Sequence, residues 1–132
     1  MPPSTWLRAL AFGLLVVAAA PTVVPAQALQ PLMHGWNQHF TVTWETAQRR
    51  GRPQIAGYVN NRSPYRVGNL RVLVDSLDAA GLVVDQRVSW VLGELGGDSR
   101  LYFEVPVTSA ASYRVSVFSY DRVDQSASVM AP

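Results

Sequence analysis

The residues best suited to metal binding are Met33, His34 and His39, which stand close together in the first third of the chain. Thioether and imidazole groups are ligands that copper accepts in proteins. The chain has no cysteine and only these two histidines, and their spacing of five residues puts them on opposite faces of an extended segment. This set does not reach the ligand count of a protein metal site. We therefore predict no metal and no other cofactor.

Nucleophilic catalysis needs a nucleophile, a base and a group that orients the base. No serine lies in a G-x-S-x-G elbow, and both histidines precede the first predicted strand. The carboxylates that would have to pair for glycoside hydrolysis fall at outward strand positions or in loops, where solvated carboxylates are normal: Glu45, Asp85, Glu94, Asp98 and Glu104. We predict no catalytic residues, and a protein that is not an enzyme.

Five residues remain as candidates for binding. Arg49, Arg50 and Arg52 form the only basic cluster, which suits a phosphate, a glycan or an acidic partner, although a solvated hairpin tip has the same composition. Trp36 and Tyr65 fall in loop-like segments and are candidates for exposed contacts.

Two other tryptophans, Trp44 and Trp90, alternate in phase with aliphatic neighbours. Side chains in that phase share one face of a strand. We predict that both indoles lie in the core of the domain.

The start of the chain has the pattern of a secretory signal. Arg8 precedes an uncharged apolar run, residues 9–20, and Ala26-Gln27-Ala28 supplies small residues at the spacing that a signal peptidase reads. A membrane anchor needs about 20 apolar residues, whereas this run has 12 and prolines follow it. We predict a signal peptide over residues 1–28, cleavage between Ala28 and Leu29, and export to the periplasm or the medium without stable membrane insertion.

The charge balance of the chain gives little attraction for polyanions. All 11 basic residues are arginines, and without Arg8 ten of them face nine acidic residues, a net charge of +1. Such a small surplus does not steer nucleic acid to a protein, and no nucleic-acid-binding motif is present. We predict an unidentified protein partner and no nucleic acid.

Beyond the leader, apolar and polar residues alternate with a period of two, which predicts strands with one buried face. Six such stretches are separated by turns rich in Gly, Pro, Asn and Asp, and they include Phe40–Trp44, Ile55–Val59, Leu70–Val74, Leu82–Leu92, Leu101–Val105 and Tyr113–Val117. We predict an all-β, Ig-like (fibronectin-type) β-sandwich of six to seven antiparallel strands over residues 39–125. An irregular lead-in, 29–38, would precede it and a flexible tail, 126–132, would follow. A small closed barrel is the alternative.

The central part of the chain carries a pattern of short motifs. A G-x-V-x-N element is followed by L-D-x-x-G-x-V-V, an L-G element and a phenylalanine strand, carried here by Gly57–Asn61, Leu77–Val84, Leu92-Gly93 or Leu95-Gly96, and Phe103. Residues 55–105 resemble the FxLYD-type and related Ig-like domains of exported bacterial proteins. The naming motif keeps only Asp78. The resemblance implies an interaction or scaffold module without catalytic residues.

Several of these motif residues also have structural roles. Gly57 admits the close approach of a backbone or large side chain, Asn60 caps a turn through its amide, and Asp78 with Gly81 closes a turn.

These observations predict a non-catalytic exported protein-interaction or cell-envelope accessory module. Edge-strand pairing, or contact through the loops at one end of the sandwich, would provide recognition. The alternative is a periplasmic carrier of a small ligand (a lipid, a glycan or a metal), which would need a continuous apolar cavity.

Overall fold

A computed structural model describes residues 28–123 of the 132-residue chain. The predicted signal peptide up to Gln27 and the predicted tail, 126–132, lie outside the described residues. Ala28 and Leu29, which flank the predicted cleavage site, are exposed and belong to no helix or strand. The described part has no helix that is long and apolar enough to span a membrane.

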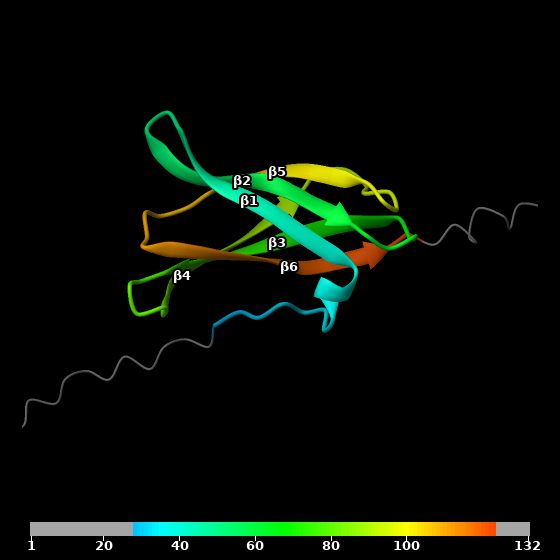
Figure 1. Cartoon of the computed structure of the whole chain (residues 1–132), viewed down its shortest axis with the longest axis horizontal. Coiled ribbons are helices and arrows are strands. Elements are labelled where there is room, and N and C mark those ends of the chain that lie inside the picture. Colours follow the sequence, from blue (N-terminus) through cyan, green and yellow to red (C-terminus); the bar gives the residue numbers. More distant parts are fainter. Residues whose placement is uncertain (1–27, 124–132) are drawn as a thin grey trace, which may run out of the picture.

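The described residues form two three-stranded antiparallel sheets packed face to face (Figure 1). One sheet has the order β1-β2-β5 and the other the order β4-β3-β6. A single turn of 3-10 helix, η2 (Trp36–Gln38), precedes the strands, which are β1 (Phe40–Arg49), β2 (Arg52–Asn61), β3 (Val67–Leu77), β4 (Val83–Val91), β5 (Arg100–Pro106) and β6 (Ser112–Arg122). The predicted all-β sandwich is confirmed, and its strand order is that of strands A-B-E facing C′-C-F in an immunoglobulin-type domain.

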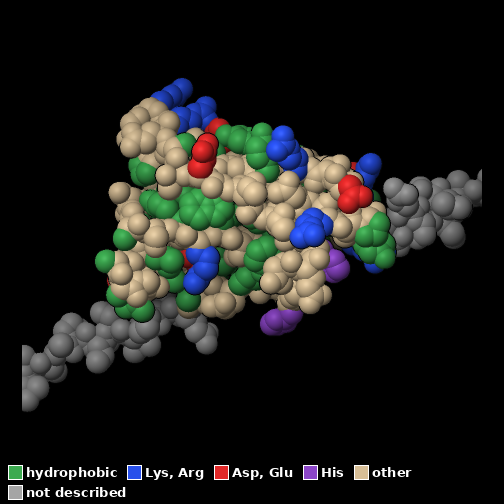
Figure 2. Space-filling view, viewed as in Figure 1, with side chains coloured by type: hydrophobic (Ala, Val, Ile, Leu, Met, Phe, Trp, Pro, Cys, Tyr) green, Lys and Arg blue, Asp and Glu red, His purple; other side chains and the backbone are tan. Residues whose placement is uncertain are grey.

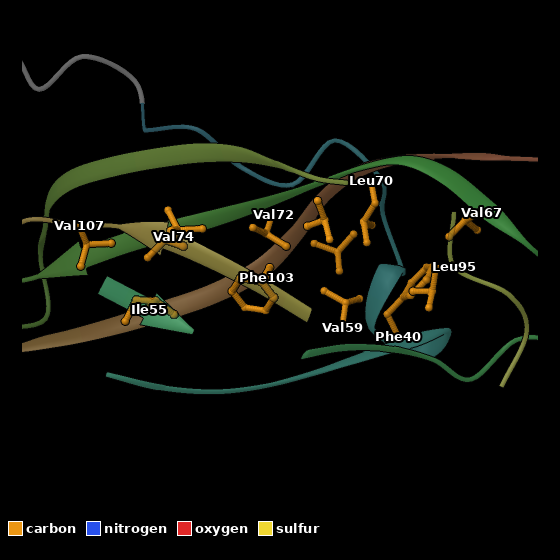
Figure 3. Close-up of a cluster of buried hydrophobic side chains, with 13 residues drawn as sticks. Phe40, Ile55, Val59, Val67, Leu70, Val72, Val74, Leu95, Phe103 and Val107 are labelled. Carbon is orange, nitrogen blue, oxygen red and sulfur yellow. The ribbon is translucent and has the colours of Figure 1, made fainter. Parts of the chain in front are cut away.

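The core lies between the inner faces of the two sheets (Figure 3). The aliphatic residues of the central strands β2 and β3 supply six of its thirteen buried residues, and Phe103 and Val105 join them from β5. As predicted from their period of two, the fully buried members include Ile55, Val59, Leu70, Val72 and Val74.

The prediction that Trp44 and Trp90 lie in the core is wrong, because they are 37% and 59% exposed. Trp90 pairs across the strands with Arg71, which belongs to the outward-facing series of β3. Trp44 is on the edge strand β1, and the β1–β2 hairpin rises away from the opposite sheet (Figure 1). Alternation identifies residues that share a face, but it does not say which face is covered.

The segment 28–35, which includes most of the predicted lead-in 29–38, lies across the outer face of the β4-β3-β6 sheet. The Leu29 N–H donates to Gln86 Oε1 at 2.8 Å on β4, and the Leu32 N–H donates to the Phe118 carbonyl at 2.8 Å on β6. We call this segment the strap. It explains why Leu73 and Asp75, which point outward from β3, are only 1% and 2% exposed.

A polar cluster lies beneath the strap on the same outer face. The Asp75 carboxylate accepts hydrogen bonds from Gln86 Nε2 at 2.7 Å and from Arg114 Nε at 2.9 Å, and Arg114 also forms an ion pair with it at 2.8 Å. Gln86 and Arg114 are the cross-strand neighbours of Asp75 on β4 and β6. The buried charge is therefore fully partnered, and Gln86 links it to the strap.

The turns follow the expected chemistry with one correction. Asp78 closes the β3–β4 turn by accepting hydrogen bonds from the Ala80 and Leu82 N–H groups, and Gly81 takes a φ of 84° there. The amide that caps the β2–β3 turn belongs to Asn61, not to Asn60 as predicted.

Candidate functional site

The outer side of β4 carries the most exposed apolar stretch on any strand of the described chain. Val84, Val88 and Trp90 point outward on it, and we call these three residues the β4 stripe. Trp90 is 59% exposed and Val84 is equally so. Leu82 and Leu92, just beyond the two ends of the strand, are exposed as well. Neighbouring apolar side chains that remain in water favour contact with another molecule.

Arg71 holds the indole of Trp90 in place. Its guanidinium carbon lies 5.0 Å from the centroid of the Trp90 ring and 5.1 Å from that of Phe118, and its Nε donates to Ser119 Oγ at 2.7 Å. A cation over an aromatic face is attracted by the ring quadrupole. One face of the indole is therefore fixed by the domain while much of the ring stays accessible.

β4 is also an edge strand, since it pairs only with β3 among the described strands. Its outer edge has unpaired backbone groups, which another strand can pair with. Asp85 and Arg87 take the other face of the strand and form an ion pair at 3.4 Å. Charged residues facing inward are one way in which edge strands avoid unspecific pairing.

The other three edge strands, β1, β5 and β6, present less exposed apolar surface beside an open edge. The outward side chains of β1 and β5 are mainly polar or charged, and the strap already contacts the β6 edge at Phe118. An apolar surface beside an open edge is thus a feature of β4 among the strands that the structure describes.

The three arginines predicted as a binding cluster come together at the tip of the β1–β2 hairpin, where Figure 2 shows basic side chains gathered. They line a shallow hollow of about 520 Å³. The turn itself is only Arg50-Gly51, with φ values of 54° and 76°, as in a two-residue hairpin turn. Arg49 is paired with Glu104 at 3.0 Å.

Tyr65 lies at the other end of the sandwich, in the β2–β3 turn. It lines a hollow of about 150 Å³ together with His39, Tyr120 and Arg122, and the Arg122 guanidinium carbon lies 3.3 Å from the centroid of its ring. Trp36 is half-buried and packs against the core. The five predicted binding residues therefore do not form one site, since the arginines and Tyr65 lie at opposite ends of the domain.

The outer face of the β1-β2-β5 sheet carries an aromatic and charged cluster. The rings of Tyr58 and Tyr102 meet edge to face at 5.3 Å, and the Arg100 guanidinium carbon lies 4.1 Å from the centroid of the Tyr58 ring. The Tyr102 hydroxyl donates to Glu104 Oε1 at 2.9 Å. Because only the neutral phenol can donate this bond, the pKa of Tyr102 is raised above its ordinary value.

Residues 28–123 contain no group of three or more His, Cys, Asp or Glu side chains close enough to hold a metal ion.

The sequence does not predict the β4 stripe, because the phase of Trp90 with its aliphatic neighbours indicates a core position. Asp85 and Arg87 occupy the alternate phase of the same strand, which is the pattern of any half-buried strand and predicts the apolar side as the buried one. The chain matches no protein-family model, no curated protein and no solved structure.

Proposed function

We propose that the chain is an exported, non-catalytic interaction domain of the cell envelope that binds a protein partner by strand addition at β4. The observation that carries this proposal is the β4 stripe, which places exposed valine and tryptophan side chains beside an open strand edge. The resemblance of residues 55–105 to FxLYD-type domains supports the same role.

Strand addition divides recognition between backbone and side chains. The edge supplies main-chain hydrogen bonds, and the side chains that alternate along it give specificity. Covering an exposed valine or tryptophan contributes about 25 cal/mol per Å² of apolar surface removed from water. Asp85 and Arg87 flank the centre of the edge, so the incoming strand must offer charges that complement them.

The export part of the proposal rests on the leader pattern of residues 1–28 and on the exposure of Ala28 and Leu29. We expect N-terminal sequencing of the protein recovered from cells to begin at Leu29. A product that keeps Met1 and stays in the membrane would contradict export by cleavage.

The binding part is tested by placing a charge in the stripe. We expect Val88→Lys to weaken partner binding about tenfold or more, because lysine on an edge strand opposes pairing with an apolar strand. Val88 is 37% exposed, so the unfolding temperature should change by only about 4 °C or less. The measurement is quantitative mass spectrometry of envelope proteins retained by the immobilised wild type and variants.

Tyr102→Lys is the matched control, because Tyr102 is an exposed aromatic residue on the outer face of the edge strand β5 in the other sheet. Proteins retained by the wild type and by this control, but lost with Val88→Lys, support the proposal. Identical retention by all three proteins, or no specific retention by any, overturns it.

A small-ligand carrier is the second candidate, favoured by the hollow at Tyr65. Its imidazole, phenol and guanidinium groups, from His39, Tyr120 and Arg122, would suit an anionic ligand. Saturable quenching of tryptophan fluorescence by anionic lipid headgroups or glycans, abolished by Arg122→Ala, would favour this function over strand addition.

A further inference from the structure

The sequence of β4 is complementary to itself about its central residue, Gln86. In an antiparallel pair centred there, residue numbers that face each other add up to 172. Asp85 then faces Arg87 and Val84 faces Val88. Trp90 would extend past the end of the second strand, toward the β3–β4 turn that holds Leu82. Charge therefore meets opposite charge, and the two valines of the β4 stripe meet each other.

We propose that the partner at this edge is a second copy of the chain, with two β4 strands paired antiparallel across a two-fold axis at Gln86. This inference rests on the proposed function, because it uses the same edge. The two β4-β3-β6 sheets would join into one continuous sheet of six strands. Such an interface is isologous, so each contact occurs twice.

The charges specify this register over its neighbours. Centring the pair on Asp85 would place two carboxylates opposite each other, and centring it on Arg87 would place two guanidinium groups opposite each other. An axis between two residues would set the outward side chains of one strand against the inward side chains of the other. Only the Gln86 axis pairs Asp85 with Arg87 twice.

Within each chain, Asp85 and Arg87 already lie on the same face of β4. Asp85 Oδ2 lies 3.4 Å from Arg87 Nε within one strand, and Thr108 Oγ1 also donates to Asp85 Oδ2 at 3.4 Å. Both side chains of the pair are partly exposed. In the dimer each carboxylate would exchange its own Arg87 for Arg87 of the second copy.

The outer face supplies the apolar part of the contact. The strand register shifts between Ser76 and Leu77, which leaves Val84 without a partner on β3. Its side chain is therefore free to meet Val88 of the second copy. Leu29 is held on Gln86 by two hydrogen bonds and is exposed, so it lies beside the proposed axis and adds apolar surface.

The experiment is a charge exchange measured on the exported protein as isolated from cells. Mass from light scattering is followed over concentrations of about 1 to 500 µM, the range for a small, single-strand interface. We expect the wild type to dimerise. Asp85→Arg and Arg87→Asp each create two like-charge contacts and should raise the dimer Kd roughly tenfold or more.

Two further measurements restore the pairing of opposite charges and so make the test specific to this register. A mixture of the two single variants pairs an Arg-Arg strand with an Asp-Asp strand, so a heterodimer should form although neither variant dimerises alone. The double variant Asp85→Arg with Arg87→Asp should dimerise like the wild type. Circular dichroism confirms that every variant is folded.

Three results would overturn the inference: a wild type that is monomeric at all concentrations, a dimer that neither single variant weakens, or folded variants that fail to recover in the mixture. A monomeric wild type that still retains envelope proteins in a manner sensitive to Val88→Lys removes the second copy as partner and leaves the proposed function intact. If that retention is absent as well, both fail.

Discussion

Replacing Gly57 by alanine is expected to destabilise the domain by about 3 kcal/mol or more, or to prevent folding. A Cβ atom at this position would overlap the Thr43 carbonyl oxygen and lie 2.7 Å from the Trp44 Cα. Both neighbours are backbone atoms of β1, so they cannot move aside as the end of a flexible side chain can. The whole β1–β2 pairing would have to shift.

The matched control is Gly68→Ala, since Gly68 is another buried strand glycine. A Cβ there would meet Val123 at 3.6 Å, which is ordinary contact. We expect Gly68→Ala to change the stability by less than about 1 kcal/mol and Gly57→Ala to lower the unfolding temperature by about 15 °C. Thermal and urea unfolding measure both. Equal effects of the two substitutions would show that the close approach of β1 to Gly57 is not required.

Replacing Asn61 by alanine is the second substitution with a large expected effect, about 3 kcal/mol of lost stability. Asn61 is 1% exposed, and its Nδ2 donates to the Tyr65 carbonyl at 2.6 Å and to the Gly96 carbonyl at 3.2 Å. Its Oδ1 accepts from the Ser63 N–H at 2.9 Å and from the Ser63 hydroxyl at 2.7 Å. Removing the amide leaves several buried groups unpaired, each at a cost of about 1–3 kcal/mol.

Asn60→Ala tests whether this loss belongs to the buried network. The Asn60 amide makes one hydrogen bond in the described structure, to the Thr41 carbonyl at 3.3 Å, and the residue is half-buried. We expect its replacement to cost less than about 1 kcal/mol. Urea unfolding midpoints at equal m-values compare the two. A greater loss at Asn60 than at Asn61 would contradict the assignment of the turn cap.

The fold was predictable because its central strands obey a simple rule. Residues of β2 and β3 that alternate in the sequence fill the space between the sheets, and Gly57 admits a close backbone as expected. The rule fails at the edges. Trp90 has the same phase relation to its neighbours as a core residue, yet it is exposed because no element within residues 28–123 covers the outer side of its strand over Trp90 and Val88.

The strap could not be predicted from its composition. Residues 28–35 have no periodicity. Their backbone groups form hydrogen bonds with the Gln86 side-chain amide and with the Phe118 carbonyl, and no sequence pattern records these bonds. Leu73 is buried on the outer face that the strap crosses. The choice between Asn60 and Asn61 as the turn cap likewise depends on which amide faces the Leu95–Gly96 loop.

These findings give each face of the β4-β3-β6 sheet a separate role. The inner face holds the core, and the strap with the Asp75 cluster closes the outer face over β3. β4 extends beyond this cover with its edge open and its stripe exposed. A domain arranged in this way can bind another strand without rearranging its core.

Photo-crosslinking in cells from a benzophenone side chain placed at Val88 tests most directly whether β4 is a binding edge. The same group at Tyr102 serves as the reference on the opposite sheet. We predict crosslinks from position 88, with peptides of a second β4 strand among the products, and few or none from position 102. Crosslinks from position 102 alone, or from neither position, would contradict the claim.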